Sequence, residues 1–84
     1  MFGKVKKPPH LIESHEEYGK VLLQLDDRTR IIRCRDDIQN IVQRKGGDTW
    51  HGKSFCTTLE ALVRDAGYIH QDFEQTVLDH FNKQ

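Results

Sequence analysis

Residues 37–65 read DIQNIVQRKGGDTWHGKSFCTTLEALVRD, and this stretch decides the fold class. Gly46 and Gly47 form a turn signal between two runs of residues that favour strands, and the second run holds the only Trp of the chain. Thr57 and Thr58 then precede apolar residues at helical spacing. The stretch therefore predicts a β-hairpin followed by a capped helix.

The first half of this stretch fits two structures. As a short helix, Ile38, Ile41 and Val42 share one face, and a preceding aspartate can cap the start. As a strand, Ile38 and Val42 share a face with Asn40. Periodicity does not separate the two in so short a run, but the glycine turn behind it favours a hairpin. We predict a strand over residues 37–44 and keep the helix as the alternative.

Two further strands are expected upstream, over residues 19–25 and 29–34, because both runs are aliphatic and a short polar break separates them. A first helix is expected over residues 58–66. Thr57 and Glu60 have capping-box spacing, Thr58 is the competing cap, and Gly67 is placed to end the helix in a left-handed conformation.

A second helix is expected over residues 71–83, with an acidic first turn and an apolar stripe of Phe73, Val77 and Phe81. The sequence thus predicts an α+β domain over residues 18–84, in which a three- or four-stranded antiparallel sheet packs against a C-terminal helix pair. We expect Val42, Trp50 and Phe55 in the core or at its rim.

Residues 1–17 are expected to form a flexible N-terminal arm, because they hold Pro8 and Pro9, two lysine clusters and only Leu11 and Ile12 as apolar anchors. The first ten residues lack the apolar core of a signal peptide, and no run approaches the ~18 apolar residues that span a bilayer. We therefore expect a cytoplasmic protein without a membrane partner.

No catalytic or metal-binding motif is recognisable. The five His and two Cys show neither C-x₂-C nor H-x₃-H spacing, and His51 and Cys56 fall on opposite faces of a regular strand. Gly52 to Ser54 lacks the preceding glycine spacing of a phosphate-binding loop. We expect a non-enzymatic protein without metal or cofactor, whose Cys34 and Cys56 are free thiols.

Charge is uneven along a chain whose formal net charge is zero. Residues 1–45 hold ten Lys and Arg against seven Asp and Glu, whereas residues 46–84 hold three against six. A basic, aromatic-bearing sheet can enter the DNA major groove or stack single-stranded bases. The plainer interpretation is that the two halves attract each other inside the fold. The candidate nucleic-acid contacts are Arg28, Arg30, Arg33, Arg44, Lys45, His51 and Lys53.

The alternative function is a protein-interaction module or homodimer that uses the second helix and its acidic surface. An open basic sheet would favour nucleic acid, whereas an exposed stripe of Phe73, Val77 and Phe81 would favour a protein partner. Arg on strands also protects sheet edges against pairing, so the basic residues alone do not decide between the two functions.

Residues 32–65 resemble a family of small proteins of unknown function from bacterial genomes and prophage-like regions. The family pattern runs roughly C-[RD]-D-x-I-Q-W-I-L-Q-R…W-[RH]-G-[RK]-S-[YF]-C-x-T-[RK]-E-A-L. Asn40 stands where the family has an aromatic residue, and Leu59 replaces a basic one. The resemblance implies no established activity. The matching residues are Cys34, Asp37, Ile38, Gln39, Ile41, Gln43 and Arg44, then Trp50, His51, Gly52, Lys53, Ser54, Phe55, Cys56, Thr58, Glu60, Ala61 and Leu62.

A looser, architectural likeness concerns the order of elements. Three strands followed by a helix that contains T-x-E-A-L look like the arm-binding domains of phage integrases and plant ethylene-response-type DNA-binding domains, which read DNA with the sheet. Because one fold serves many functions, this likeness supports the nucleic-acid hypothesis only by analogy.

Overall fold

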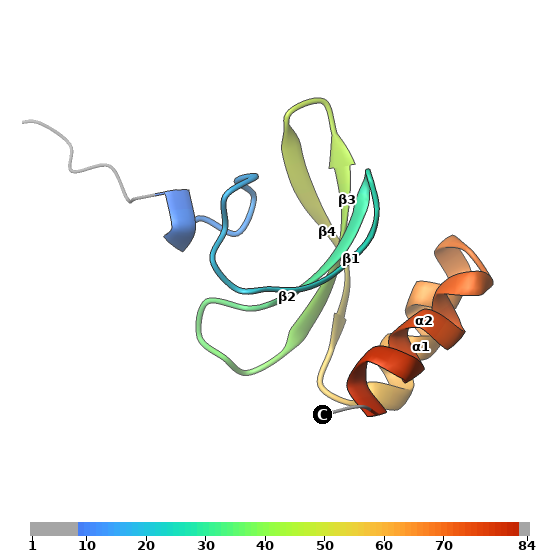
Figure 1. Ribbon diagram of the computed structural model, residues 1–84. Coiled ribbons are helices and arrows are strands. Elements are labelled where there is room, and N and C mark those ends of the chain that lie inside the picture. The colour runs from blue at the N-terminus through green and yellow to red at the C-terminus, as the bar shows by residue number, and fades with distance from the viewer. Residues whose placement is uncertain (1–8, 83–84) are drawn as a thin grey trace, which may run out of the picture.

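A four-stranded antiparallel sheet in the order β1-β2-β3-β4 carries a helix pair on one side and the N-terminal segment, residues 10–19, on the other (Figure 1). The computed structural model describes residues 9–82. This confirms the predicted α+β fold, with four strands. In chain order the elements are the 3₁₀ turn Pro9–Leu11, β1 Val21–Asp26, β2 Thr29–Arg33, β3 Asn40–Gly46, β4 Thr49–Cys56, α1 Leu59–Ile69 and α2 Asp72–Asn82.

The β3–β4 hairpin closes as the glycine turn predicts. Gly46 pairs with Thr49, which leaves a two-residue turn in which Gly47 has a φ of 61°. Glycine adopts this left-handed conformation without steric cost. The strand interpretation of residues 37–44 is confirmed from Asn40 onward. The residues before it form a turn instead, in which Asp37 has a φ of 60°.

A β-bulge interrupts β4. Gln43 pairs with Gly52 and Val42 pairs with Ser54, so Lys53 is an extra residue in the strand. The bulge places His51 and Cys56 on the same face, because their partners Arg44 and Asn40 are separated by an even number of residues. The expectation of opposite faces is therefore wrong. The two side chains still lie about four residues, roughly 13 Å, apart along the sheet.

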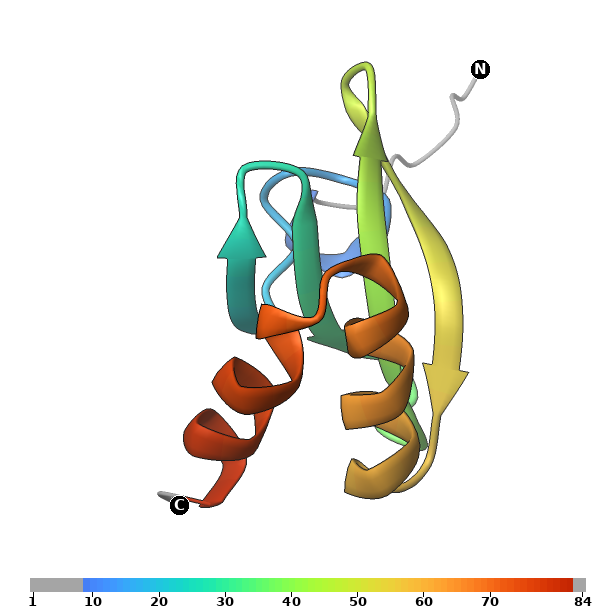
Figure 2. The same ribbon diagram turned by 90° about the vertical axis from the view of Figure 1, so that its right-hand side faces the viewer.

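Apolar side chains on both faces of the sheet are buried, as neighbouring pairs such as Ile31 and Ile32 show. The larger cluster joins the sheet to the helices; α1 packs against β3 and β4, and α2 packs against β1 (Figure 2). Its buried members are Ile31, Val42, Cys56, Leu62, Ala66, Phe73 and Val77. The smaller cluster lies on the opposite face and consists of Tyr18, Ile32, Cys34 and Ile41.

Two details of α1 differ from the sequence expectation. Thr58, not Thr57, is the N-cap, and its side chain accepts a hydrogen bond from the Ala61 N–H at 3.1 Å. The helix also continues through Gly67 to Ile69, so Gly67 is not a left-handed stop. Gly67 is instead a point of close approach, because a Cβ there would lie 2.5 Å from the side chain of Glu74 on α2.

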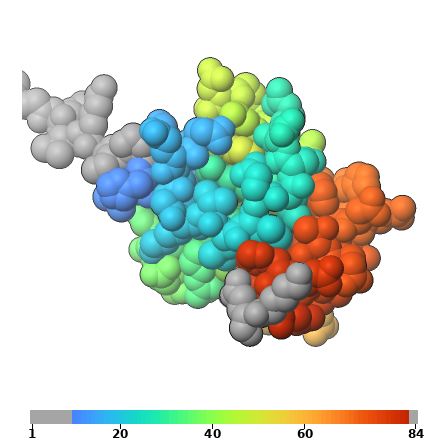
Figure 3. All heavy atoms as spheres, in the orientation of Figure 1, coloured from blue at the N-terminus to red at the C-terminus, as the bar shows by residue number. Residues whose placement is uncertain are grey.

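The expected flexible arm lies only partly within the described residues, since residues 1–8 fall outside them. From His10 onward the chain packs on the sheet. The Trp50 N–H donates to the Ser14 carbonyl at 3.0 Å, and the Gly19 N–H donates to the His10 carbonyl at 2.9 Å. Figure 3 shows β1, in teal, between this segment and the orange and red helices on one face of the molecule. The packed part of the chain therefore begins well before residue 18.

Candidate functional site

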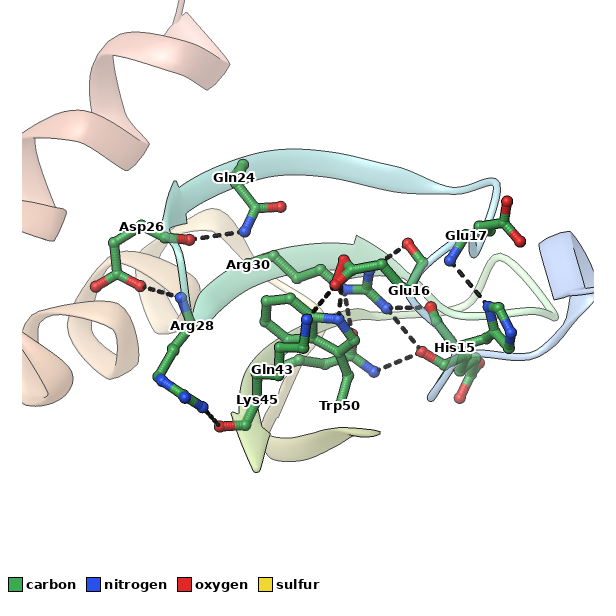
Figure 4. A network of polar contacts seen from close by, with 11 residues as sticks. His15, Glu16, Glu17, Gln24, Asp26, Arg28, Arg30, Gln43, Lys45 and Trp50 are labelled. Atoms are coloured by element: carbon green, nitrogen blue, oxygen red, sulfur yellow. Dashed lines mark hydrogen bonds and ion pairs between the residues drawn. The ribbon is translucent and has the colours of Figure 1, made fainter. Parts of the chain in front are cut away.

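Arg30 lies at the centre of the contact between the sheet and the N-terminal segment, and its side chain is buried (Figure 4). Its guanidinium donates to Gln43 Oε1 at 2.7 Å and to the main-chain carbonyls of Glu13, His15 and Glu16 at 3.0, 2.9 and 3.2 Å. Burial lowers the pKa of Arg30, although the nearby Glu16 carboxylate acts in the opposite direction. All these donors are used inside the fold, so Arg30 is a structural residue rather than a nucleic-acid contact.

Trp50 and Lys45 complete this arrangement. The Arg30 guanidinium lies 4.2 Å from the centroid of the buried Trp50 ring, and Lys45 Nζ lies 5.7 Å from it. Lys45 pairs with the Glu16 carboxylate, which also accepts a hydrogen bond from Trp50 Nε1 at 3.3 Å. The hydrogen bond from Lys45 holds the pKa of Glu16 below its ordinary value, and the bond from Trp50 adds to this. Trp50 is therefore not available to stack a base.

Arg33 is engaged at the other end of β2. Its guanidinium donates to Asn40 Oδ1 at 3.1 Å and to the main-chain carbonyl of Asp37, which holds the β2–β3 turn. Arg33 pairs with Asn40 and Thr29 pairs with Arg44, so Arg33 and Arg44 are separated along the sheet. The structure does not bring the seven predicted basic residues into one site.

Within residues 9–82, four of the seven are bound neither to the N-terminal segment nor to the β2–β3 turn. Arg28, His51 and Lys53 are exposed and Arg44 is half-buried. Arg28 donates to the Lys45 carbonyl at 3.2 Å, and Arg44 donates to Thr29 Oγ1 at 2.8 Å. Arg28 and Arg44 share an open hollow of about 320 Å³ with the acidic residues Asp26 and Asp27. The positive potential of this hollow is therefore reduced by its own carboxylates.

A groove between the two helices is a feature that the sequence interpretation missed. Leu59, Glu60 and Val63 of α1 and Leu78 of α2 line it, and its volume is about 410 Å³. We call these four residues the helix groove. The three apolar side chains are half-buried, so they pack on the core with one edge and face solvent with the other. The sequence signal for the groove is that α1 has apolar residues beyond the buried Leu62 and Ala66, namely Leu59 and Val63, which are only half-buried.

The apolar stripe of α2 does not form the alternative interface that the sequence suggested. Phe73 and Val77 are buried in the core between helices and sheet, and only Phe81 is half-buried. The large apolar side chains that remain exposed lie elsewhere: Tyr68 is 79% exposed and Ile38 is 68% exposed. Phe55, expected in the core or at its rim, is 61% exposed, because its ring lies over the arm-side face next to Gly52.

Both cysteines are free and buried. Cys56 Sγ donates to Asp65 Oδ2 at 3.3 Å, and burial together with this carboxylate raises the pKa of Cys56 to about 11. Burial also acts to raise the pKa of Cys34, but hydrogen bonds from the backbone N–H groups of Ile38, Gln39 and Asp36 outweigh it and lower the pKa overall. The two thiols therefore differ in chemical character.

Within residues 9–82, no three His, Cys, Asp or Glu side chains come together in a way that could hold a metal ion. None of the helices in the same part of the chain has the length and apolar character needed to span a membrane.

Comparisons with known proteins returned no matching family model, no matching curated protein and no matching solved structure. The resemblance of residues 32–65 to a bacterial family of unknown function therefore stays a hypothesis. The function has to be argued from the surfaces themselves.

Proposed function

We propose that the protein is a non-enzymatic binding module that docks a partner protein in the helix groove. The observation that carries this proposal is an apolar depression of about 410 Å³ between two neighbouring helices, lined by three half-buried aliphatic side chains. Leu59, Val63 and Leu78 offer partly exposed apolar surface, and such surface is typical of protein-interaction sites.

The location of the groove also favours a protein over a nucleic acid. Residues 59–82 carry Glu60, Asp65, Asp72, Glu74 and Asp79 against the single basic residue Arg64, counting His as neutral. Phosphates would be repelled by this helix layer. The helices cover one face of the sheet, and the N-terminal segment covers part of the other, where Phe55 stays exposed (Figure 1).

Site-specific photo-crosslinking tests this proposal. A photoreactive amino acid replaces Glu60 at the edge of the helix groove and, as a matched control, Asp48 at the tip of the β3–β4 hairpin. Both positions are exposed and acidic. We expect one discrete protein adduct from position 60 that is absent from position 48 and is lost when Leu78→Ser is added. Adducts that are equal at both positions, or insensitive to Leu78→Ser, would contradict the proposal.

A second candidate function is nucleic-acid binding at the end of the sheet, by the remaining Arg28, Arg44, His51 and Lys53. The observation that favours it is that the side chains of Arg28 and Arg44 donate only to uncharged oxygens, which leaves their charge available to a phosphate. Titration of labelled duplex and single-stranded DNA at several salt concentrations tests it. Replacing both arginines with alanine should reduce the slope of log affinity against log salt by about 1.4 to 1.8. An unchanged slope would exclude these contacts.

A further inference from the structure

We infer that the segment docked in the helix groove is a basic amphipathic helix of another protein. This inference rests on the proposed function and specifies the partner of the same site. It follows from the shape of the groove, from the chemistry of its floor and from the charge around it.

The shape of the groove calls for a helix. α1 and α2 are each eleven residues long, about 16 Å, and lie side by side in opposite directions (Figure 2). Their backbone hydrogen bonds are made within each helix, so the groove offers no unpaired strand edge for an extended peptide. A third helix can lay its side chains between the ridges of two neighbouring helices. The groove is therefore suited to a helical segment of two to three turns.

The floor of the groove sets the apolar anchors. Leu59 and Val63 are one helical turn apart on α1, and Leu78 faces them from α2. Such a floor accommodates two or three aliphatic side chains spaced at i, i+3 or i+4 and i+7 on the partner. Since area alone does not set affinity, these few anchors would supply most of the binding energy.

One acidic side chain lines the groove and a second lies beside α1 one helical turn beyond Val63. Glu60 lines the groove near the start of α1, and the Glu74 side chain of α2 lies against α1 at Gly67. Both carboxylates are exposed, and no basic side chain among residues 9–82 is recorded as an ion-pair partner of either. Asp65 differs, because Arg64 and Cys56 already contact it. Lys or Arg beside the apolar anchors of the partner would complement Glu60 and Glu74.

The same charge argues against a second copy of this chain as the occupant. Two helix layers with five acidic residues and one Arg each would face each other with like charges. An anionic membrane surface would be repelled for the same reason. The charge pattern therefore selects a basic partner over both of these.

The test uses the full-length ¹⁵N-labelled protein and a synthetic Leu/Lys peptide with one continuous apolar stripe. The peptide has about five turns, more than the groove holds, because shorter isolated helices are marginal in water. Two control peptides share its length: one has the same composition in an order that breaks the stripe, and the other has Glu in place of Lys. We expect chemical-shift changes centred on Leu59, Val63 and Leu78 with the Leu/Lys peptide. Affinity should be at least about tenfold weaker for both controls, and should fall as salt is raised.

Matched variants separate groove binding from general attraction between opposite charges. Leu78→Ser should weaken binding of the Leu/Lys peptide at least about fivefold, because it removes one of the apolar side chains that the peptide contacts. Phe55→Ser, on the exposed surface of the sheet, should leave the affinity unchanged. Glu60→Lys should weaken binding about threefold or more, whereas the same charge change at exposed Glu17 should have less effect.

The outcomes distinguish the inference from the proposed function. Preferential binding of the Leu/Glu peptide at the groove, or a dimer dissociated by Leu78→Ser, would overturn the basic-helix inference while the groove remains a protein-docking site. If Leu78→Ser and Phe55→Ser change the affinity for the Leu/Lys peptide equally, the peptide is held only by general charge attraction, and the basic-helix inference is overturned. If no peptide shifts the groove resonances but position 60 still crosslinks a partner, the partner is not a basic helix. If the crosslink is absent as well, both fail.

Discussion

Replacing Arg30 by methionine should remove the main attachment of the N-terminal segment to the sheet. Methionine keeps much of the length of the buried stem but has no donors. It leaves Gln43 Oε1 and three main-chain carbonyls without the guanidinium that they contact at 2.7 to 3.2 Å. It also removes the cation that lies 4.2 Å from the Trp50 ring centroid.

The magnitude follows from these contacts. Hydrogen bonds to a charged group contribute about 1.5–3 kcal/mol each, but the cost of keeping the charge buried is recovered when the charge is removed, and water can reach some of the freed carbonyls. We expect a net loss of about 3 kcal/mol in the free energy of unfolding. A domain of this size has a total of roughly 4–13 kcal/mol, so the melting temperature should fall by about 12 °C or more.

Urea unfolding followed by Trp50 fluorescence and by far-ultraviolet circular dichroism measures this loss. Arg30→Lys keeps the charge without the planar fork and should lose about half as much. Arg35→Met changes the same residue type at an exposed position and should cost less than about 0.5 kcal/mol. The reasoning is refuted if Arg30→Met lies within about 0.5 kcal/mol of the wild type, or if Arg35→Met is as costly.

Three further predictions concern other elements. Because the pKa of Glu16 is lowered in the folded protein, its contact with Lys45 should be complete above the ordinary glutamate pKa and lost as pH falls through the folded-state pKa. The Trp50 indole N–H resonance should report this midpoint below about pH 4.3, and Glu16→Gln should abolish the transition. Gly67→Ala should stabilise α1 by up to about 1 kcal/mol, because the Glu74 side chain can swing away from the added methyl group. A lower melting temperature that is restored by adding Glu74→Ala would show that the Glu74 side chain cannot move. Under denaturing, non-reducing conditions we expect two titratable thiols. In the native protein at pH 8, alkylation followed by mass spectrometry should modify Cys34 before Cys56, whose pKa is about 11, and the reverse order would contradict the described environments.

The order of elements could be predicted from the sequence because each depends on local signals. The glycine turn, the aliphatic alternation of residues 29–34 and the apolar spacing of α1 lie within short windows. The bulge at Lys53 could not be predicted, since it depends on which residue of β3 faces which residue of β4. The role of Gly67 could not be predicted either, since the glycine lies inside α1 and is approached by Glu74 of another helix.

The candidate basic site was predicted less well, because charge in a sequence does not say where a side chain ends. In the sequence, Arg28, Arg30, Arg44 and Lys45 are equivalent, because each is a basic residue on or beside a strand. The fold separates them: Arg30 and Lys45 point to the face that the N-terminal segment covers, where carbonyls and the Glu16 carboxylate receive them. The sequence pattern predicts a flexible arm there and therefore does not identify Glu16 as the partner of Lys45 and Trp50.

The ion pairs also show that basic residues of the sheet do not neutralise the acidic residues of α1 and α2. The uneven charge of the sequence is also compatible with a basic first half and an acidic second half that attract each other inside the fold. Among residues 9–82, however, Lys20 pairs with Asp37 and Lys45 pairs with Glu16, both within the first half, and Arg64 pairs with its neighbour Asp65. In the same part of the chain, no Lys or Arg on a strand forms an ion pair with a residue of α1 or α2. The helices remain net acidic around an apolar groove, so their charge is available to select a partner, and this is why we infer a basic helix as that partner.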